Sequence, residues 1–133
     1  MIGNILIIDD RKIFRASIIS VLREKGFNAL GVPSGKMALE RVRHKDIDLV
    51  ILKNDLPNWS GLRTLRKIKA EIDEIVVICI ADELAEETRN EYQKHGVEAI
   101  IPKRKFWGNI DKFIKELFPA KLSPRFLDNN HLE

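Results

Sequence analysis

Two adjacent carboxylates, Asp9 and Asp10, follow directly after the apolar run Ile5–Ile8. Neighbouring acids at the end of a buried strand are costly to ionise unless a cation offsets their charge. Carboxylate oxygens are the ligands that Mg²⁺ prefers in proteins, so one interpretation is a magnesium site. The alternative is structural: Asp10 caps the helix that follows, and Asp9 is a solvated turn residue.

Two lysines follow other apolar runs. Lys53 comes directly after Leu49–Leu52 in the stretch DLVILKNDLPNWSG, and Asp55 lies two residues further on. Lys103 follows the apolar tripeptide IIP. An ammonium group at a strand end can bind a phosphoryl oxygen as a point charge. The alternative for Lys103 is a solvated surface patch that it forms with the two basic residues after it.

Five short apolar runs define the elements that must position these side chains. Strands of a parallel sheet read as continuous apolar segments because helices cover both faces of the sheet. Three of the five runs are nearly continuous in Ile, Leu and Val. The predicted strands are Ile5–Ile8, Ala29–Val32, Leu49–Leu52, Ile75–Ile80 and Val97–Ile101.

Amphipathic stretches with apolar residues at helical spacing alternate with the strands. Gly26 and Gly96 end the first and fourth of these helices, and Ser34 can cap the second. The residues expected on the buried helix faces are Phe14, Ile18, Val21 and Leu22; Met37, Leu39 and Val42; Leu62, Leu65 and Ile68; Leu84, Thr88 and Tyr92; and Ile110, Phe113, Ile114 and Leu117.

The alternation predicts an α/β fold, a doubly wound five-stranded parallel sheet of the flavodoxin-like (βα)5 type with strand order 2-1-3-4-5. In such folds the functional site lies beyond the carboxyl ends of the strands, at the point where the strand order reverses. The predicted carboxyl ends carry Asp9 and Asp10, Lys53, Ile80 with Ala81, and Lys103. We therefore expect these residues to share one site.

Composition limits the classes of function. The chain has 133 residues, 44% hydrophobic and 32% charged, with a formal net charge of +3. The apolar runs are too short to span a bilayer, and we expect no membrane partner. The mild, scattered positive charge does not favour nucleic-acid binding. The single cysteine, Cys79, lies in an apolar run, which fits a core residue of a cytoplasmic protein. We expect one domain over residues 1–119 and a tail or linker over 120–133, whose last residues fit a tag remnant as well.

Three sequence blocks resemble the receiver domain of response regulators, and the likeness covers roughly residues 3–118. The acidic pair Asp9–Asp10 matches the metal-binding pair of that family. DLVILKNDLPNWSGL, with its proline and glycine, matches the segment from the third strand into the third helix. GVEAIIPK, ending at Lys103, matches the fifth strand and the phosphoryl-binding lysine. The resemblance implies a role in two-component signalling, in which an aspartate accepts a phosphoryl group beside Mg²⁺.

Several positions depart from the family pattern. Lys53 stands at the phosphoacceptor position, and Ile80, followed by Ala81, stands where the family has a threonine or serine. Arg104 replaces the proline after the lysine, and Ile100 stands at the aromatic switch position. The resemblance therefore implies a receiver-like module that is not an enzyme, and that acts without phosphorylation through protein contacts.

Two questions about this site stay open in the sequence. The Lys53 ammonium either pairs with Asp9 and Asp10 in the place of Mg²⁺, leaving no need for a cofactor, or extends into solvent. The alternative functions are a phosphorelay receiver that uses Asp55, Asp9 or Asp10 as acceptor, and the receiver part of a longer DNA-binding response regulator. The phosphorelay alternative would still include a metal ion bound at Asp9 and Asp10.

The resemblance also implies a partner-binding face formed by the fourth helix, the fifth strand and the fifth helix. We expect its partners to be proteins of a bacterial signalling pathway, a histidine kinase or an effector. An acidic segment from Asp82 to Glu87 and a basic edge nearby also permit a homodimer through this face. For Trp107 a core role and an interface role are equally open, whereas Phe106 is expected in the core. The residues assigned to the face are Ile100, Arg104, Lys105, Phe106 and Trp107.

Overall fold

The computed structural model describes residues 3–110 and residue 112. Five parallel strands form one sheet in the order β2-β1-β3-β4-β5, as predicted. The strands are β1 (Asn4–Ile8), β2 (Asn28–Val32), β3 (Leu49–Lys53), β4 (Val76–Ile80) and β5 (Ala99–Ile101). The helices are α1 (Lys12–Glu24), α2 (Gly35–His44), α3 (Gly61–Glu71), α4 (Glu86–Lys94) and α5 (Lys103–Gly108).

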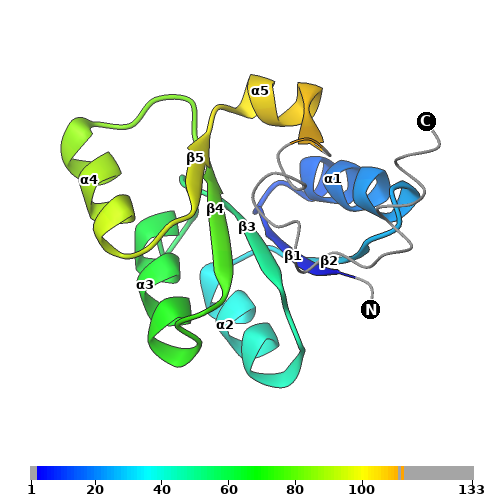
Figure 1. Cartoon of the computed structure of the whole chain (residues 1–133), viewed down its shortest axis with the longest axis horizontal. Helices are drawn as coiled ribbons and strands as arrows, with labels where there is room; N and C mark the ends of the chain where they lie inside the picture. The colour runs from blue at the N-terminus through cyan, green and yellow to red at the C-terminus, as the bar shows by residue number, and fades with distance from the viewer. Residues whose placement is uncertain (1–2, 111, 113–133) are drawn as a thin grey trace.

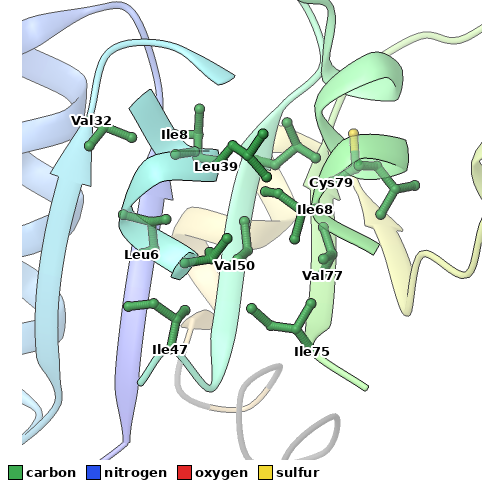
Figure 2. Close-up of a cluster of buried hydrophobic side chains, with 14 of the residues drawn as sticks. Leu6, Ile8, Val32, Leu39, Ile47, Val50, Ile68, Ile75, Val77 and Cys79 are labelled. Carbon is green, nitrogen blue, oxygen red and sulfur yellow. The ribbon is translucent and has the colours of Figure 1, made fainter. Parts of the chain in front are cut away.

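Helices cover both faces of this sheet, so its central strands are buried on both sides (Figure 1). Strand residues alternate between the two faces. Ile5, Ile7 and Ile51 pack in one core cluster with residues of α1 and α5. Leu6 and Val50 pack in the other with residues of α2, α3 and α4 (Figure 2). The continuous apolar composition of the strands is the consequence of this two-sided burial.

The helix termini follow local side-chain chemistry. Ser34 accepts a hydrogen bond from the backbone N–H of Met37, so the predicted cap of α2 is present. Ser60 caps α3 in the same way. Gly26 and Gly96 have positive φ values of 95° and 84° where the first and fourth helices end. Only a residue without a Cβ adopts this conformation freely, and this property underlies the prediction of both helix ends.

Three expectations about buried helix faces were wrong. Met37 is 47% exposed, because the buried residues of α2 are Gly35, Ala38, Leu39 and Val42, and position 37 lies off their face. Phe14 is 39% exposed and contacts cations at the carboxyl end of the sheet. Leu84 precedes α4, which begins only at Glu86.

The end of the chain lies largely outside the described residues. Ile110 is buried in the core cluster under α1, as expected for the fifth helix. The predicted helix residues Phe113, Ile114 and Leu117, and the expected tail or linker over 120–133, fall outside the described part. Within the described residues, no helix has the length and apolar composition that a membrane span requires.

Candidate functional site

The carboxyl ends of the parallel strands bring the predicted site residues to one edge of the sheet. In the register of the sheet, Ile8 pairs with Leu52, and Lys53 pairs with Ile80. Asp9 therefore leaves β1 beside the end of β3, where Lys53 is the last strand residue. Ile80 pairs in turn with Ile101, two residues before Lys103. Because register fixes these positions, the strands deliver acids and lysines to a common edge.

Asp9 is bound by an arginine that the sequence analysis did not single out. Asp9 is only 3% exposed, and its Oδ1 accepts hydrogen bonds from the Arg11 backbone N–H at 2.9 Å and from Arg11 Nε at 3.1 Å. Arg11 Nη2 donates to Asp9 Oδ2 at 2.9 Å. This two-pronged contact with a carboxylate raises the pKa of Arg11. Asp9 is therefore not the solvated turn residue of the structural alternative.

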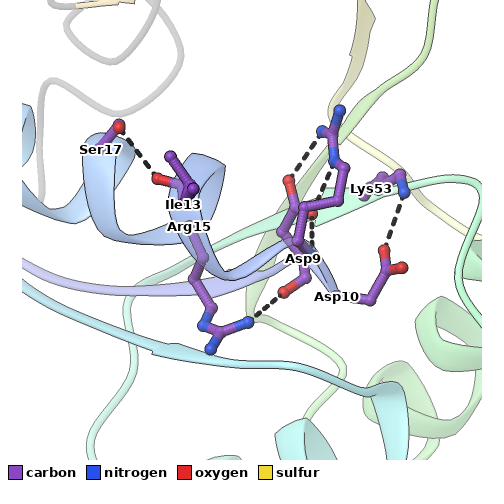
Figure 3. Close-up of polar contacts among 7 residues, drawn as sticks. Asp9, Asp10, Ile13, Arg15, Ser17 and Lys53 are labelled. Carbon is purple, nitrogen blue, oxygen red and sulfur yellow. Dashed lines mark hydrogen bonds and ion pairs between the residues drawn. The ribbon is translucent and has the colours of Figure 1, made fainter.

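Asp10 is paired with Lys53 rather than used as a helix cap. Lys53 Nζ donates to Asp10 Oδ1 at 2.8 Å, and the two side chains are 22% and 33% exposed (Figure 3). The hydrogen bond from Lys53 lowers the pKa of Asp10. The N-cap position of α1 is Arg11, which makes no side-chain cap bond. The alternative in which Asp10 caps this helix is therefore wrong, and Lys53 does not extend freely into solvent.

The donor set does not fit a magnesium ion in this arrangement. Arg11 binds both carboxylate oxygens of Asp9, and Lys53 binds one oxygen of Asp10. Asp55, two residues after Lys53, is exposed. Among residues 3–110 and 112, no group of three or more histidine, cysteine or acidic side chains is arranged to hold a metal. A divalent ion would have to displace a guanidinium and an ammonium group that already offset the charges of the acids.

Within residues 3–110, Lys103 forms no ion pair with either member of the acidic pair. Its Nζ is 4.0 Å from the centre of the Phe14 ring, and the Arg11 guanidinium carbon is 4.1 Å from the same ring centre. The backbone N–H of Lys103 donates to Asp82 Oδ1 at 2.9 Å. Cations are attracted to the face of an aromatic ring. Phe14 therefore holds Lys103 at the mouth of the site, although sequence reasoning placed this ring in the core.

A cavity of about 290 Å³ occupies the edge of the sheet. Its wall includes Asp9, Lys53, Asp55, Ile80, Ala81 and Lys103, so the structure brings together every predicted pocket residue except Asp10. Asp10 does not line the cavity, but it accepts a hydrogen bond from Lys53, which does. Ile80 contributes an apolar side chain, since isoleucine carries no hydroxyl that could bind an oxyanion.

The residues assigned to the partner-binding face have different environments. Arg104 and Lys105 are exposed on α5. Ile100 is half-buried on β5 and packs against the core. Phe106 is buried at 1% exposure, as expected. Trp107 is half-buried, packs against the core beside Phe106 and lines the cavity.

A tyrosine below the site links α4 to the loop after β3. Tyr92 is fully buried, and its hydroxyl donates to Asn54 Oδ1 at 2.6 Å. Burial raises the pKa of Tyr92. The helical spacing predicts Tyr92 on the core face of the fourth helix but not this hydrogen bond. Its only sequence signal is a tyrosine rather than a phenylalanine at a core position, because a buried hydroxyl needs a partner.

The sequence model of the response regulator receiver domain matches residues 5–115 of the chain. The chain belongs to this family. It is 33% identical over 102 residues to the autoinducer 2 sensor kinase/phosphatase LuxQ of Vibrio cholerae, which is 75% of this chain and 12% of LuxQ. It is 33% identical over 82 residues to the response regulator RR06 of Streptococcus pneumoniae, which is 60% of this chain and 38% of RR06. This receiver domain therefore spans only a minor part of these relatives.

A relative of similar size is the two-component response regulator ORR5 of rice, which is 29% identical over 103 residues, 75% of this chain and 77% of ORR5. Among solved structures, the chemotaxis protein CheY4 of Vibrio cholerae superposes with a TM-score of 0.82 at 16% identity, covering 89% of this chain and all of CheY4. A response regulator receiver domain protein from Clostridium thermocellum superposes with a TM-score of 0.81 at 24% identity. The superposition covers 90% of this chain and 97% of that protein. At these identities the superpositions establish the fold.

Proposed function

We propose that this receiver domain is a signalling module that works without phosphorylation, through contacts with other proteins, and that Lys53 stands in the place of the phosphoacceptor aspartate. The ion pair between Lys53 Nζ and Asp10 Oδ1, 2.8 Å long, carries this proposal. It gives the strand-end lysine a defined role inside the pocket. The role is charge neutralisation, which in other receivers falls to a metal ion.

The chemistry of the pocket argues against phosphoryl transfer to this position. An acylphosphate forms when a carboxylate oxygen attacks phosphorus, and the Lys53 ammonium has neither a carboxylate nor a free electron pair. Ile80 offers no hydroxyl to the new phosphoryl group. The Lys103 ammonium lies 4.0 Å from the centre of the Phe14 ring and, within the described residues, forms no ion pair with the acids. The nucleophile and the hydroxyl donor are thus both missing where the family reaction needs them.

The internal cations also argue against a need for Mg²⁺. Arg11 and Lys53 neutralise Asp9 and Asp10 without a bound ion. We expect tryptophan fluorescence of the wild-type protein to show no saturating change with Mg²⁺ in the sub-millimolar range. In Lys53→Asp the added carboxylate replaces the ammonium, so this matched variant should show one. A saturating response of the wild type would contradict the proposal.

Intact mass spectrometry after incubation with acetyl phosphate and Mg²⁺ tests phosphorylation directly. We expect the wild-type mass to stay unchanged. A labile gain of about 80 Da, the mass of one phosphoryl group, would overturn the proposal. Peptide mapping of that adduct would then separate Asp55, Asp9 and Asp10 as acceptors. This outcome would establish the competing function, a phosphorelay receiver with a non-standard acceptor.

The proposed partners are proteins, a histidine kinase or an effector of a bacterial signalling pathway in the cytoplasm. The surface formed by α4, β5 and α5 supports this role because it combines exposed charges of both signs. Glu86 and Glu87 are exposed at the start of α4, and Arg104 and Lys105 are exposed on α5. Such a surface selects a partner of complementary charge and accelerates its association.

A further inference from the structure

The cavity at the edge of the sheet is lined on part of its wall by apolar side chains and elsewhere by charged and polar groups. Its apolar wall consists of Ile7, Ile18, Ile51, Ile80, Phe106 and Trp107. These side chains come from the strands β1, β3 and β4, and from the helices α1 and α5 on one face of the sheet. A concave site with apolar walls and a few polar groups is the usual form of a small-molecule site. The pocket therefore offers an apolar surface to part of a ligand and charged groups to the rest of it.

The three cations that line this cavity differ in their partners. Arg11 is bound to Asp9 and Lys53 is bound to Asp10. Lys103 is half-buried, and within residues 3–110 its ammonium makes only the contact with the Phe14 ring. An ammonium that is partly withdrawn from water gains from a carboxylate partner. Lys103 is thus the lining cation that can bind an acid from outside.

The acids around the cavity do not cancel this attraction. Asp55 and Glu83 line the cavity but are exposed, so water and salt screen their charge. Asp82 is also exposed, and its Oδ1 accepts the hydrogen bond from the Lys103 backbone N–H. The side chain of Lys103 extends from that position to the Phe14 ring, which itself lines the cavity. The buried acid of the lining, Asp9, is paired with Arg11, so Lys103 is the lining cation within residues 3–110 that has no carboxylate partner.

The volume limits the size of a ligand. An apolar cavity of about 150 Å³ binds one benzene molecule. The cavity of about 290 Å³ therefore accepts a body of one to two rings or an equivalent aliphatic chain.

We propose that this cavity binds a small amphipathic carboxylate, with its apolar body against Ile18, Ile80 and Trp107 and its carboxylate on Lys103. The proposal rests on the proposed function, because a pocket that transferred phosphoryl groups would have to keep this space and Lys103 for phosphate. Binding of such a ligand would also give a receiver that is not phosphorylated an input signal. Lys103 directly precedes Arg104 and Lys105, so a ligand that draws its ammonium off Phe14 acts next to the proposed partner face.

Three probes of equal shape test the proposal on the full chain: 4-cyclohexylbutyrate, 4-cyclohexylbutylamine and 4-cyclohexylbutanol. Binding is measured by isothermal titration calorimetry and by ¹H–¹⁵N amide shifts. We expect the acid to bind about tenfold or more tightly than the amine and the alcohol, which corresponds to one charge-assisted contact. The amide shifts should concentrate at Ile80, Lys103 and Trp107. Equal affinity for acid and amine, no binding of the acid at millimolar concentration, or shifts elsewhere would overturn the proposal.

Variants locate the two halves of the ligand site. Lys103→Met should weaken binding of the acid about tenfold and leave binding of the alcohol unchanged. Lys36→Met, an exposed lysine of α2, is the matched control and should change neither. Ile80→Phe should fill the cavity and abolish binding of both. Acid binding that survives unchanged in Lys103→Met would refute the assignment. The intact-mass experiment with acetyl phosphate is independent of these titrations, so failure of this proposal and failure of the proposed function are distinguishable.

Discussion

Asp9 and Asp10 are neighbours in the chain, but their charges are offset in different environments. Asp9 has a side chain only 5% exposed and meets an arginine through both of its oxygens. Asp10 has a side chain 33% exposed and meets Lys53 through a single oxygen. Loss of a hydrogen-bond partner lowers the free energy of unfolding most where water cannot take the place of that partner. The two cations are therefore expected to differ in their contribution to stability.

Arg11→Gln should lower the free energy of unfolding by about 1–3 kcal/mol, because it leaves the buried Asp9 carboxylate without its charged partner. Lys53→Met should cost less than about 1 kcal/mol, because water reaches Asp10. Urea unfolding followed by circular dichroism measures both values under the same conditions. Equal losses in the two variants would show that burial of Asp9 does not govern its pairing.

The pair between Lys53 and Asp10 should also respond to pH. The hydrogen bond from Lys53 lowers the pKa of Asp10 below its ordinary value of 3.8. The stabilisation is therefore fully present above pH 3.8 and is lost as the pH falls through the lowered native pKa. In a carboxyl ¹³C NMR titration, Lys53→Met should raise the pKa of Asp10 toward the ordinary value. An unchanged titration curve would mean that the ion pair does not form in solution.

Cys79 should be chemically silent in the folded protein. It is fully buried, and burial raises the pKa of its thiol to about 11. Because the thiolate is the reactive form, a disulfide reagent at pH 8 should label Cys79 only through unfolding. The labelling rate should rise with urea in parallel with the unfolded fraction. Rapid labelling of the native protein without urea would indicate an opening of β4 that this packing does not provide.

At the scale of elements, α4 and the loop between β3 and α3 meet at Gly61. A Cβ on Gly61 would collide with the Tyr92 hydroxyl and would lie 2.8 Å from Asn54 Cα and 2.9 Å from the Lys53 carbonyl oxygen. Backbone contacts of this length cannot be relieved by a side-chain rotation. Gly61 is thus required by close approach, and the loop that begins at Asn54, directly after Lys53, is held against α4.

Gly61→Ala should destabilise the protein by about 1–3 kcal/mol, and Tyr92→Phe by about 0.5–1.5 kcal/mol through loss of the bond to Asn54. In the double variant the cost of the alanine should shrink but not vanish, because the backbone contacts remain. A double-mutant cycle from thermal or urea unfolding measures this coupling. Gly108→Ala is the control, since an added Cβ there meets nothing within 4 Å. Additive effects at Gly61 and Tyr92 would contradict the contact.

The sequence was most informative where one interaction dominates. Two-sided burial makes strands such as β1 and β3 continuous in apolar residues, so their existence and order could be predicted. Register then brings Lys53 near the acidic pair without further information. Two site contacts could not be predicted in this way. The Arg11 contact depends on a side-chain rotamer at the start of α1, and the Tyr92 bond depends on how closely α4 approaches the loop.

At the scale of the whole molecule, one sheet separates two apolar cores. The carboxyl ends of its strands carry the cavity and its polar groups. The interior provides the rigidity, because both clusters consist of apolar side chains from strands and helices. Charges therefore lie at the edge and on the helix surfaces. Besides the pairs of Arg11 with Asp9 and Lys53 with Asp10, one ion pair among the described residues joins two helices: Arg43 of α2 with Glu71 of α3 at 2.6 Å. This exposed pair links α2 and α3, on the other face of the sheet from α1. By itself it contributes little to the free energy of unfolding.

The exposed charges of α4 and α5 lead to a prediction about self-association. Glu86 and Glu87 of one copy can face Arg104 and Lys105 of another, and a two-fold axis repeats this contact twice. We expect sedimentation equilibrium to show dimers at about 50 mM salt that dissociate at about 500 mM, because salt screens exposed charges. The double variants Glu86→Lys with Glu87→Lys and Arg104→Glu with Lys105→Glu should each be monomeric. Mixed together they should pair, since each then offers the charge that the other lacks. A wild type that is monomeric at low salt would refute the homodimer and leave this face to a different protein partner.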